Sequence, residues 1–217
     1  PTRRSSDLNF LFLLIGMLVS LQILSQDKEK EKPDSLKKWK FAGMTNLTFT
    51  QLALKNWAAG GENSYSLNGL VNLNANYKHE STMWENTLQI GYGIVKQESY
   101  NEIRKTDDKI DFVSKFGYKA ASKWNYSAML NFKTQMDAGY DYAKDEKELI
   151  SEALSPAYLI IAVGMEYRPN DAFYLQLSPI TGKTTFVTND SLSAKGAYGV
   201  EKGETVRSEF GGYVKIA

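Results

Sequence analysis

Residues 64–78 read SYSLNGLVNLNANYK, and this stretch decides the fold. Its odd-numbered positions carry apolar, aromatic or small residues, while its even-numbered positions, apart from Leu70, carry serine, asparagine or lysine. Successive side chains of a β-strand point to opposite faces, so a period of two predicts a strand with one apolar and one polar face. A helix would repeat its apolar residues every three or four positions, which this stretch does not do.

The same alternation recurs along the rest of the chain. It is clear in residues 84–94, 110–118, 124–135 and 159–167, and weaker in residues 41–54, 172–180 and 208–216. The strands are long: residues 64–78 would span roughly 50 Å if straight, whereas strands of soluble proteins average about 5–6 residues. A strand crosses a membrane with about 9–11 residues. The sequence therefore predicts an all-β fold, an antiparallel up-and-down transmembrane β-barrel with about eight visible strands.

Alternation alone leaves open which face points outward, because a soluble lipocalin-like barrel with an apolar interior has the same period. The connections favour the membrane barrel. Short connections, near residues 78–83, 119–123 and 168–172, alternate with long ones at 96–108, 137–156 and 181–207. Membrane barrels show this alternation because tight periplasmic turns lie at one end and longer extracellular loops at the other.

Aromatic residues flank each short connection, together with a lysine or arginine. Aromatic rings prefer the interface between membrane and water, and long basic side chains extend to the lipid head groups. A further tryptophan precedes the glycine pair of a tight reversal at residues 57–61, where it can anchor the other rim. The predicted interface aromatics are Trp57, Tyr77, Trp84, Tyr118, Trp124, Tyr167 and Phe173.

The N-terminal part of the chain is set apart from this pattern. Residues 1–8 lack an initiator methionine and have the character of a truncation scar, and an apolar run follows as far as Leu24. That run is shorter than a membrane helix and has the form of a secretory signal cleaved near Ser25. We therefore expect a scar with signal peptide at 1–25, a charged periplasmic linker at 26–39, and an outer-membrane β-barrel at 40–217.

Composition excludes several classes of function. The chain has 217 residues, a net charge of +1, no cysteine and one histidine. These numbers exclude disulfide scaffolds, thiolate metal sites and multi-histidine metal centres, and they argue against nucleic-acid binding through a basic surface. We therefore predict no catalytic residue, no cofactor and no metal ligand. The charges expected to face the lumen, where they could select a permeant, are Asp111, Lys115, Lys119 and Lys133.

Two charged segments leave alternatives open. Residues 104–111 are interpreted as a solvated loop entering a strand, with a charged constriction as the alternative. Residues 137–153 carry a net charge of −4. Clustered carboxylates suit calcium, but the spacing matches no known calcium loop. A solvated surface segment is the favoured interpretation, and it allows a short helix near 145–153.

Several short segments of the chain are distinctive together: NWAAGGENS at 56–64, RKTDDKID at 104–111, LSPAY at 154–158, LSPITGK at 177–183 and EFGGY at 209–213. With these segments the chain resembles an uncharacterised family of outer-membrane β-barrel proteins from Gram-negative bacteria, domain-of-unknown-function family 3078. The resemblance runs from about Trp39 to Tyr213. It implies an outer-membrane barrel and supplies no substrate, partner or catalytic residue.

The predicted function is a non-enzymatic outer-membrane barrel, porin-like as a channel or a structural or surface component, in the envelope of a Gram-negative bacterium. Its expected partners are outer-membrane lipid and the barrel-assembly machinery. The alternatives are a soluble secreted lipocalin-like binder and, more remotely, a barrel enzyme acting on envelope lipid. The chain ends Lys215-Ile216-Ala217 rather than on the aromatic residue usual for such barrels, so we expect a C-terminal truncation and more strands in the intact protein.

Overall fold

The structure is a computed structural model that describes residues 38–55, 60–143, 147–170 and 172–216. All of them belong to one compact unit, Lys38–Ala217. The predicted signal peptide and most of the predicted linker lie outside the described residues, and so does Trp57.

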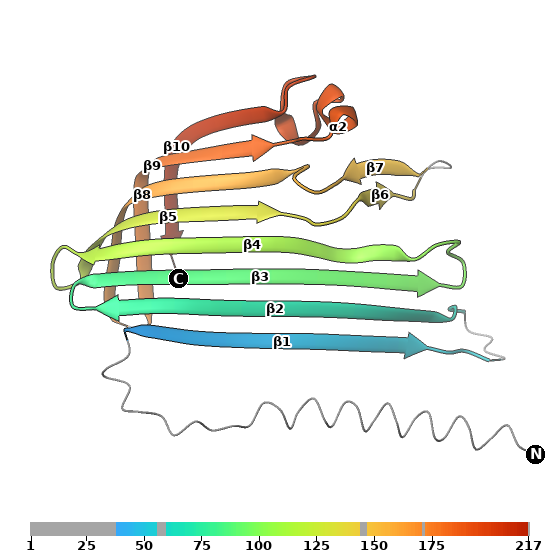
Figure 1. The fold of residues 1–217 in the computed structure, drawn as a ribbon, viewed down its shortest axis with the longest axis horizontal. Coiled ribbons are helices and arrows are strands. Elements are labelled where there is room, and N and C mark those ends of the chain that lie inside the picture. The colour runs from blue at the N-terminus through green and yellow to red at the C-terminus, as the bar shows by residue number, and fades with distance from the viewer. Residues whose placement is uncertain (1–37, 56–59, 144–146, 171, 217) are drawn as a thin grey trace, which may run out of the picture. The chain divides into compact units, whose positions relative to one another are not determined.

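Eight long strands form one antiparallel sheet with the order β1-β2-β3-β4-β5-β8-β9-β10 (Figure 1). Each strand pairs with the next long strand in the chain, so the topology is up-and-down, as predicted. The strands are β1 (Trp39–Leu52), β2 (Ser64–His79), β3 (Thr82–Gln97), β4 (Arg104–Lys119), β5 (Trp124–Thr134), β8 (Ala157–Asn170), β9 (Phe173–Phe186) and β10 (Val206–Ile216).

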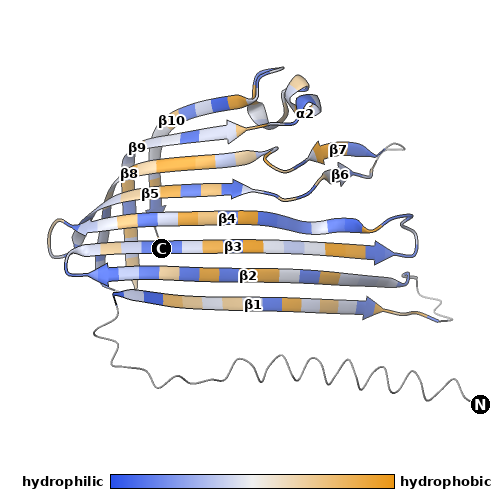
Figure 2. Cartoon of the chain, viewed as in Figure 1, coloured by the Kyte–Doolittle hydropathy of each residue, from blue (hydrophilic) through white to orange (hydrophobic). Residues whose placement is uncertain are grey.

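All eight segments predicted from alternation are strands, and the strongest of them, β2, begins at Ser64 as expected. Figure 2 shows polar and apolar residues alternating along the strands. Strands β3, β4, β8, β9 and β10 run further than the sequence pattern predicted. In particular, β4 already begins at Arg104, so the interpretation of residues 104–111 as a loop is wrong and these charges lie on a strand.

The long connections carry small elements of their own. A hairpin, β6 (Gly139–Asp141) with β7 (Glu148–Ser151), lies between β5 and β8. The short helix allowed near 145–153 is therefore wrong where the structure describes that segment, because Glu148–Ser151 pairs as a strand. Between β9 and β10 lie α2 (Asp190–Ala194) and a 3-10 turn, η2 (Ala197–Gly199). Val187, Leu192 and Val200 form a small apolar core there.

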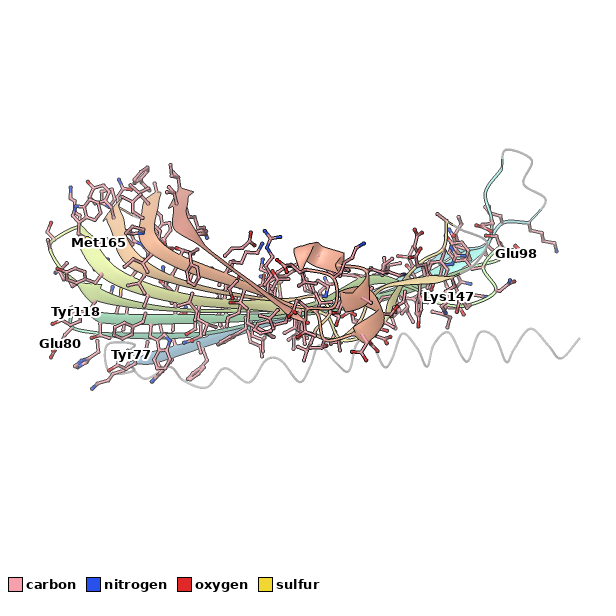
Figure 3. The ribbon with its side chains drawn as sticks, turned by 90° about the horizontal axis from the view of Figure 1, so that it is seen from above. Tyr77, Glu80, Glu98, Tyr118, Lys147 and Met165 are labelled. Carbon is pink, nitrogen blue, oxygen red and sulfur yellow. The ribbon has the colours of Figure 1, made fainter. Side chains whose placement is uncertain are left out.

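The sheet is curved and open. Figure 1 shows that β8, β9 and β10 bend so that parts of them pass behind β1–β5, and Figure 3 shows the curvature from above. Among the described residues β1 pairs only with β2, and β10 only with β9. The two edge strands are therefore unpaired on one side, and the sheet is not closed into a barrel.

The two faces of the sheet differ in character. The apolar face includes large side chains that are exposed, such as Phe41, Leu47, Val163, Ile180 and Phe210, the last of which is 89% exposed. The opposite, polar face buries Ser127, Asn131, Glu166, Gln176 and Ser178. This is the reverse of a soluble sheet, which buries its apolar face against a core.

The strands also have two distinct ends. The short connections from β2 to β3, from β4 to β5 and from β8 to β9 define the short-turn end. The longer connections from β1 to β2, from β3 to β4, from β5 to β8 and from β9 to β10 define the loop end. Figure 3 labels Tyr77, Glu80 and Tyr118 at the first and Glu98 and Lys147 at the second. No helix among the described residues is long and apolar enough to cross a membrane.

Candidate functional site

The most prominent polar cluster is centred on Lys115, which projects from the polar face of β4. Its Nζ lies 2.7 Å from a carboxylate oxygen of Glu85 on β3 and 3.0 Å from one of Glu166 on β8. Glu85 is the direct cross-strand neighbour of Lys115. The Lys115 side chain is 13% exposed and that of Glu166 1%. A lysine held between two carboxylates in a poorly solvated place needs both partners, since each unpaired buried charge would be costly.

Other polar side chains complete this cluster, which we call the interior network. Arg168 on β8 reaches Glu85 at 3.7 Å, and its guanidinium lies 5.1 Å from the ring centre of Tyr174. The Tyr174 hydroxyl donates to Gln176, and Gln176 donates to Ser178. Asn125 donates to Glu166 at 3.2 Å. The network thus links β3, β4, β5, β8 and β9.

The interior network shows that the polar face is the concave one. Arg168 and Glu85 come from strands three positions apart in the sheet, and so do Lys115 and Tyr174, whose Nζ-to-ring distance is 4.8 Å. Neighbouring strands are about 4.8 Å apart, so such strands would lie roughly 14 Å apart in a flat sheet. Curvature toward the polar face brings the side chains together and leaves the apolar face convex and exposed.

A second charged pair lies further toward the loop end. Lys133 on β5 lies 3.1 Å from Asp111 on β4, its direct cross-strand neighbour, and the Asn131 amide donates to the other Asp111 oxygen at 2.6 Å. The Lys133 side chain is 53% exposed, so this pair is far better solvated than the interior network.

All four predicted lumen charges therefore lie on the polar face, but in three separate places. Asp111 and Lys133 form one pair, Lys115 belongs to the interior network, and Lys119 is exposed at the end of β4. Sequence reasoning missed Glu85, Glu166 and Arg168 as members of the site. Alternation had placed each of them on a polar face, but it does not reveal which strands the curvature brings together.

The predicted interface aromatics that the structure describes lie at the short-turn end, where the strands adjoin the turns. Figure 3 labels Tyr77 and Tyr118 there. Tyr77 and Trp84 are direct cross-strand neighbours. The ring centre of Trp124 lies 4.8 Å from that of Tyr167, which in turn lies 6.3 Å from Phe173. Tyr118 pairs across the sheet with Tyr126. Sequence reasoning missed Trp39, whose ring lies 5.2 Å from Tyr77 and 5.7 Å from Trp84.

Carboxylates hold the loop end together. Asp108, at the outer part of β4, accepts hydrogen bonds from the backbone of Met136 and Asp137 and pairs with Lys105 at 2.7 Å. Asp137 accepts from the amide of Ala138 and from the hydroxyl of Tyr92. These two hydrogen bonds, led by the one from Ala138, lower the pKa of the Asp137 carboxyl below its usual value.

The histidine, His79, is the last residue of β2, with Nε2 3.9 Å from a carboxylate oxygen of Glu80. In the part of the chain that the structure describes, no three histidine, cysteine or acidic side chains are grouped so that they could hold a metal ion.

The fold and the interior network define the class: an all-β protein whose up-and-down sheet carries a polar concave face and an exposed apolar convex face. Residues 49–140 match the family model described as "Protein of unknown function (DUF3078)". The match confirms the family that the sequence resemblance indicated, over a shorter range than Trp39 to Tyr213. No curated protein and no solved structure matched the chain.

Proposed function

We propose that this protein is a non-enzymatic β-barrel of the outer membrane of a Gram-negative bacterium, with an interior closed by charged side chains. The single observation that carries the proposal is the reversed polarity of the sheet. Its convex face presents large apolar side chains, while its concave face buries ion pairs and amides. Lipid can cover such an apolar face, whereas its exposure to water would be unfavourable.

The aromatic rows and the connection pattern support the same proposal. Aromatic residues gather at the short-turn end, where a membrane–water interface would lie. Strands of 11–16 residues are long enough for one crossing, which takes about 9–11 residues. The soluble lipocalin-like alternative requires an apolar concave face around a ligand. Here that face carries Lys115, Glu166 and Gln176, which argues against it.

In the membrane the free edges of β1 and β10 would pair with each other directly or through further strands. Open sheet edges do not occur in contact with lipid, because their backbone groups would lack hydrogen-bond partners. A barrel of about eight strands has an interior that side chains fill, and the interior network occupies that space. This favours a structural or surface role over an open channel.

The proposal is tested by expressing the full-length gene in a Gram-negative host and fractionating the envelope. A closed membrane barrel resists SDS until it is boiled, so the protein should be found in the outer membrane and should change its gel mobility on heating. Recovery in buffer without detergent would contradict the proposal.

Conductance in planar bilayers then separates the two roles that a barrel allows. We expect the purified protein to show little conductance, because the interior network blocks the lumen. The double variant K115A/E85A should increase it, while K133A should change it little, since Lys133 lies outside that network. A large conductance in the unmodified protein would favour the channel role.

A further inference from the structure

Three strands that run toward the short-turn end each place a basic residue on the concave face close to the turn. These residues are Lys78 on β2, Lys119 on β4 and Arg168 on β8. Alternation puts them on the same face as the interior network. Lys119 lies four residues from Lys115, Arg168 lies two residues from Glu166, and Lys78 shares its face of β2 with the asparagines that precede it.

The register of the sheet spaces the three residues evenly. Across β3, Lys78 is level with Gly117, and Lys119 lies two residues further along β4. Across β5, Lys119 is level with Glu166, and Arg168 lies two residues further along β8. Each step therefore covers two strands, roughly 9.6 Å, and two residues, roughly 6.6 Å.

Steps of this size bring the three residues to one level of a membrane barrel. The line through them is inclined by roughly 35° to the hydrogen-bond direction, and the strands of such barrels are tilted by about 35–45°. The two inclinations offset each other, so Lys78, Lys119 and Arg168 would form a ring around the lumen. On β1 the same line passes between Lys38, which is bonded to Lys78 through the backbone, and Lys40.

Positive charge is in excess at this level. Lys78 and Lys119 are exposed, and no carboxylate of a described residue pairs with either of them. By contrast, Lys133 and Lys183, further toward the loop end of the same face, have carboxylate oxygens at 3.1 and 3.5 Å. In sequence, the three short connections add only two acidic residues and one lysine, which are Glu80, Asp171 and Lys123.

We infer that this ring binds a soluble, multivalent anion that carries phosphate groups. We call the ring the basic rim, and its members are Lys38, Lys40, Lys78, Lys119 and Arg168. Rings of lysine and arginine in a pore favour phosphate and other anions. Because these side chains belong to the concave face, they would face the lumen rather than lipid, so the ligand is a solute and not a lipid head group. The inference rests on the proposed barrel and names the class of ligand for its interior.

The test is a calorimetric titration of the purified full chain, in detergent micelles, with inorganic tripolyphosphate. Low ionic strength is used because salt screens exposed charges. We expect saturable binding of one tripolyphosphate per barrel. Orthophosphate should bind roughly tenfold more weakly, because it reaches fewer of the cations. Absence of saturable tripolyphosphate binding, or equal affinity for the two anions, would overturn the inference.

Matched variants locate the site. K78Q/K119Q should weaken tripolyphosphate binding roughly tenfold or more, since it removes two charged donors. K133Q/K183Q removes the same charge from the same face, but from lysines that have carboxylate partners, so it should change the affinity less than about twofold. Equal weakening by the two double variants would mean that net charge rather than the basic rim attracts the anion, and it would overturn the assignment.

Fractionation and the gel shift on heating separate failure of this inference from failure of the proposed function. Protein recovered in buffer without detergent contradicts the membrane barrel, and the basic rim with it, because the ring forms only in a closed barrel. Protein that is found in the outer membrane and shifts on heating, but does not bind tripolyphosphate, contradicts the basic rim alone. If K78Q/K119Q lacks the gel shift, the comparison of the two anions on the parent protein still decides the inference.

Discussion

Lys115 on β4 and Glu166 on β8 form an ion pair at 3.0 Å across β5, the strand that separates them in the sheet. Two residues separated by a whole strand meet only because the sheet curves toward its polar face. The ion pair therefore depends on the curvature of the sheet, and its loss should lower the stability of the whole fold.

K115M is expected to destabilise the protein by about 3 kcal/mol, because it leaves the buried Glu166 carboxylate without its cation. K133M removes a better-solvated lysine from Asp111 and should cost about 0–1 kcal/mol. Urea unfolding in detergent micelles, followed by gel mobility, measures both. E166Q added to K115M should recover part of the loss. Equal effects of K115M and K133M on the free energy of unfolding would show that the interior network stabilises the protein no more than the exposed Lys133–Asp111 pair does.

A charge placed on the convex face tests whether lipid covers it. Val163 lies in the middle of β8 on the apolar face and is 46% exposed. In a bilayer V163R should cost about 2–4 kcal/mol, the range for arginine near the midplane of a membrane barrel. In water an exposed arginine would cost less than about 0.5 kcal/mol.

Q89R is the matched control for V163R. Gln89 lies in the middle of β3 on the polar face, directly opposite Asp111. The new guanidinium can pair with that carboxylate, so unfolding in lipid vesicles should show little change. A V163R variant as stable as Q89R would mean that the convex face does not contact lipid.

Much of the fold was predictable because the period-two pattern is strong. In β2, glycine, alanine and large apolar residues share one face while asparagines fill the other, and no helical pattern competes. The weaker strands β1, β9 and β10 were identified by the same alternation. The start of β4 was missed, since charged residues such as Arg104 and Lys105 look like a loop in sequence.

The interior network was less predictable for a physical reason. Alternation places Lys115 and Glu166 on polar faces, but their contact depends on curvature and on side chains reaching past β5. The Glu148–Ser151 segment was misjudged because its local composition allows a helix. Pairing with Gly139–Asp141 overrides that preference.

Cysteine cross-linking tests how the edges of β1 and β10 are completed. The chain has no cysteine, so any disulfide that forms must come from the introduced cysteines. Met44 lies on the polar face of β1, and the polar face of β10 includes Arg207, Glu209, Gly211 and Tyr213. With M44C fixed, a cysteine at one of these four positions should form an intramolecular disulfide, because paired strands bring Cα atoms within about 5.5 Å.

The control for that scan pairs M44C with F210C, which lies on the opposite face and should not cross-link. Oxidation of outer-membrane fractions followed by gel electrophoresis reads the result. Disulfides that form only between two molecules would indicate that the edges pair with a second copy.

The loop end should loosen in acid through Asp137. Because hydrogen bonds from Ala138 and Tyr92 lower its pKa, the carboxylate stabilises the folded loop above its unfolded pKa of about 4. That contribution is lost as the pH falls through the folded pKa. Hydrogen-exchange protection of the Met136–Ala138 amides should therefore decrease below about pH 4 relative to neutral pH.

D137N isolates this effect from the neighbouring Asp108, which accepts hydrogen bonds from the amides of Met136 and Asp137. The amide of the variant cannot titrate, so its protection should be lower than that of the parent at neutral pH and should converge with it in acid. A constant difference between parent and variant across the pH range would show that Asp137 does not couple protonation to loop opening.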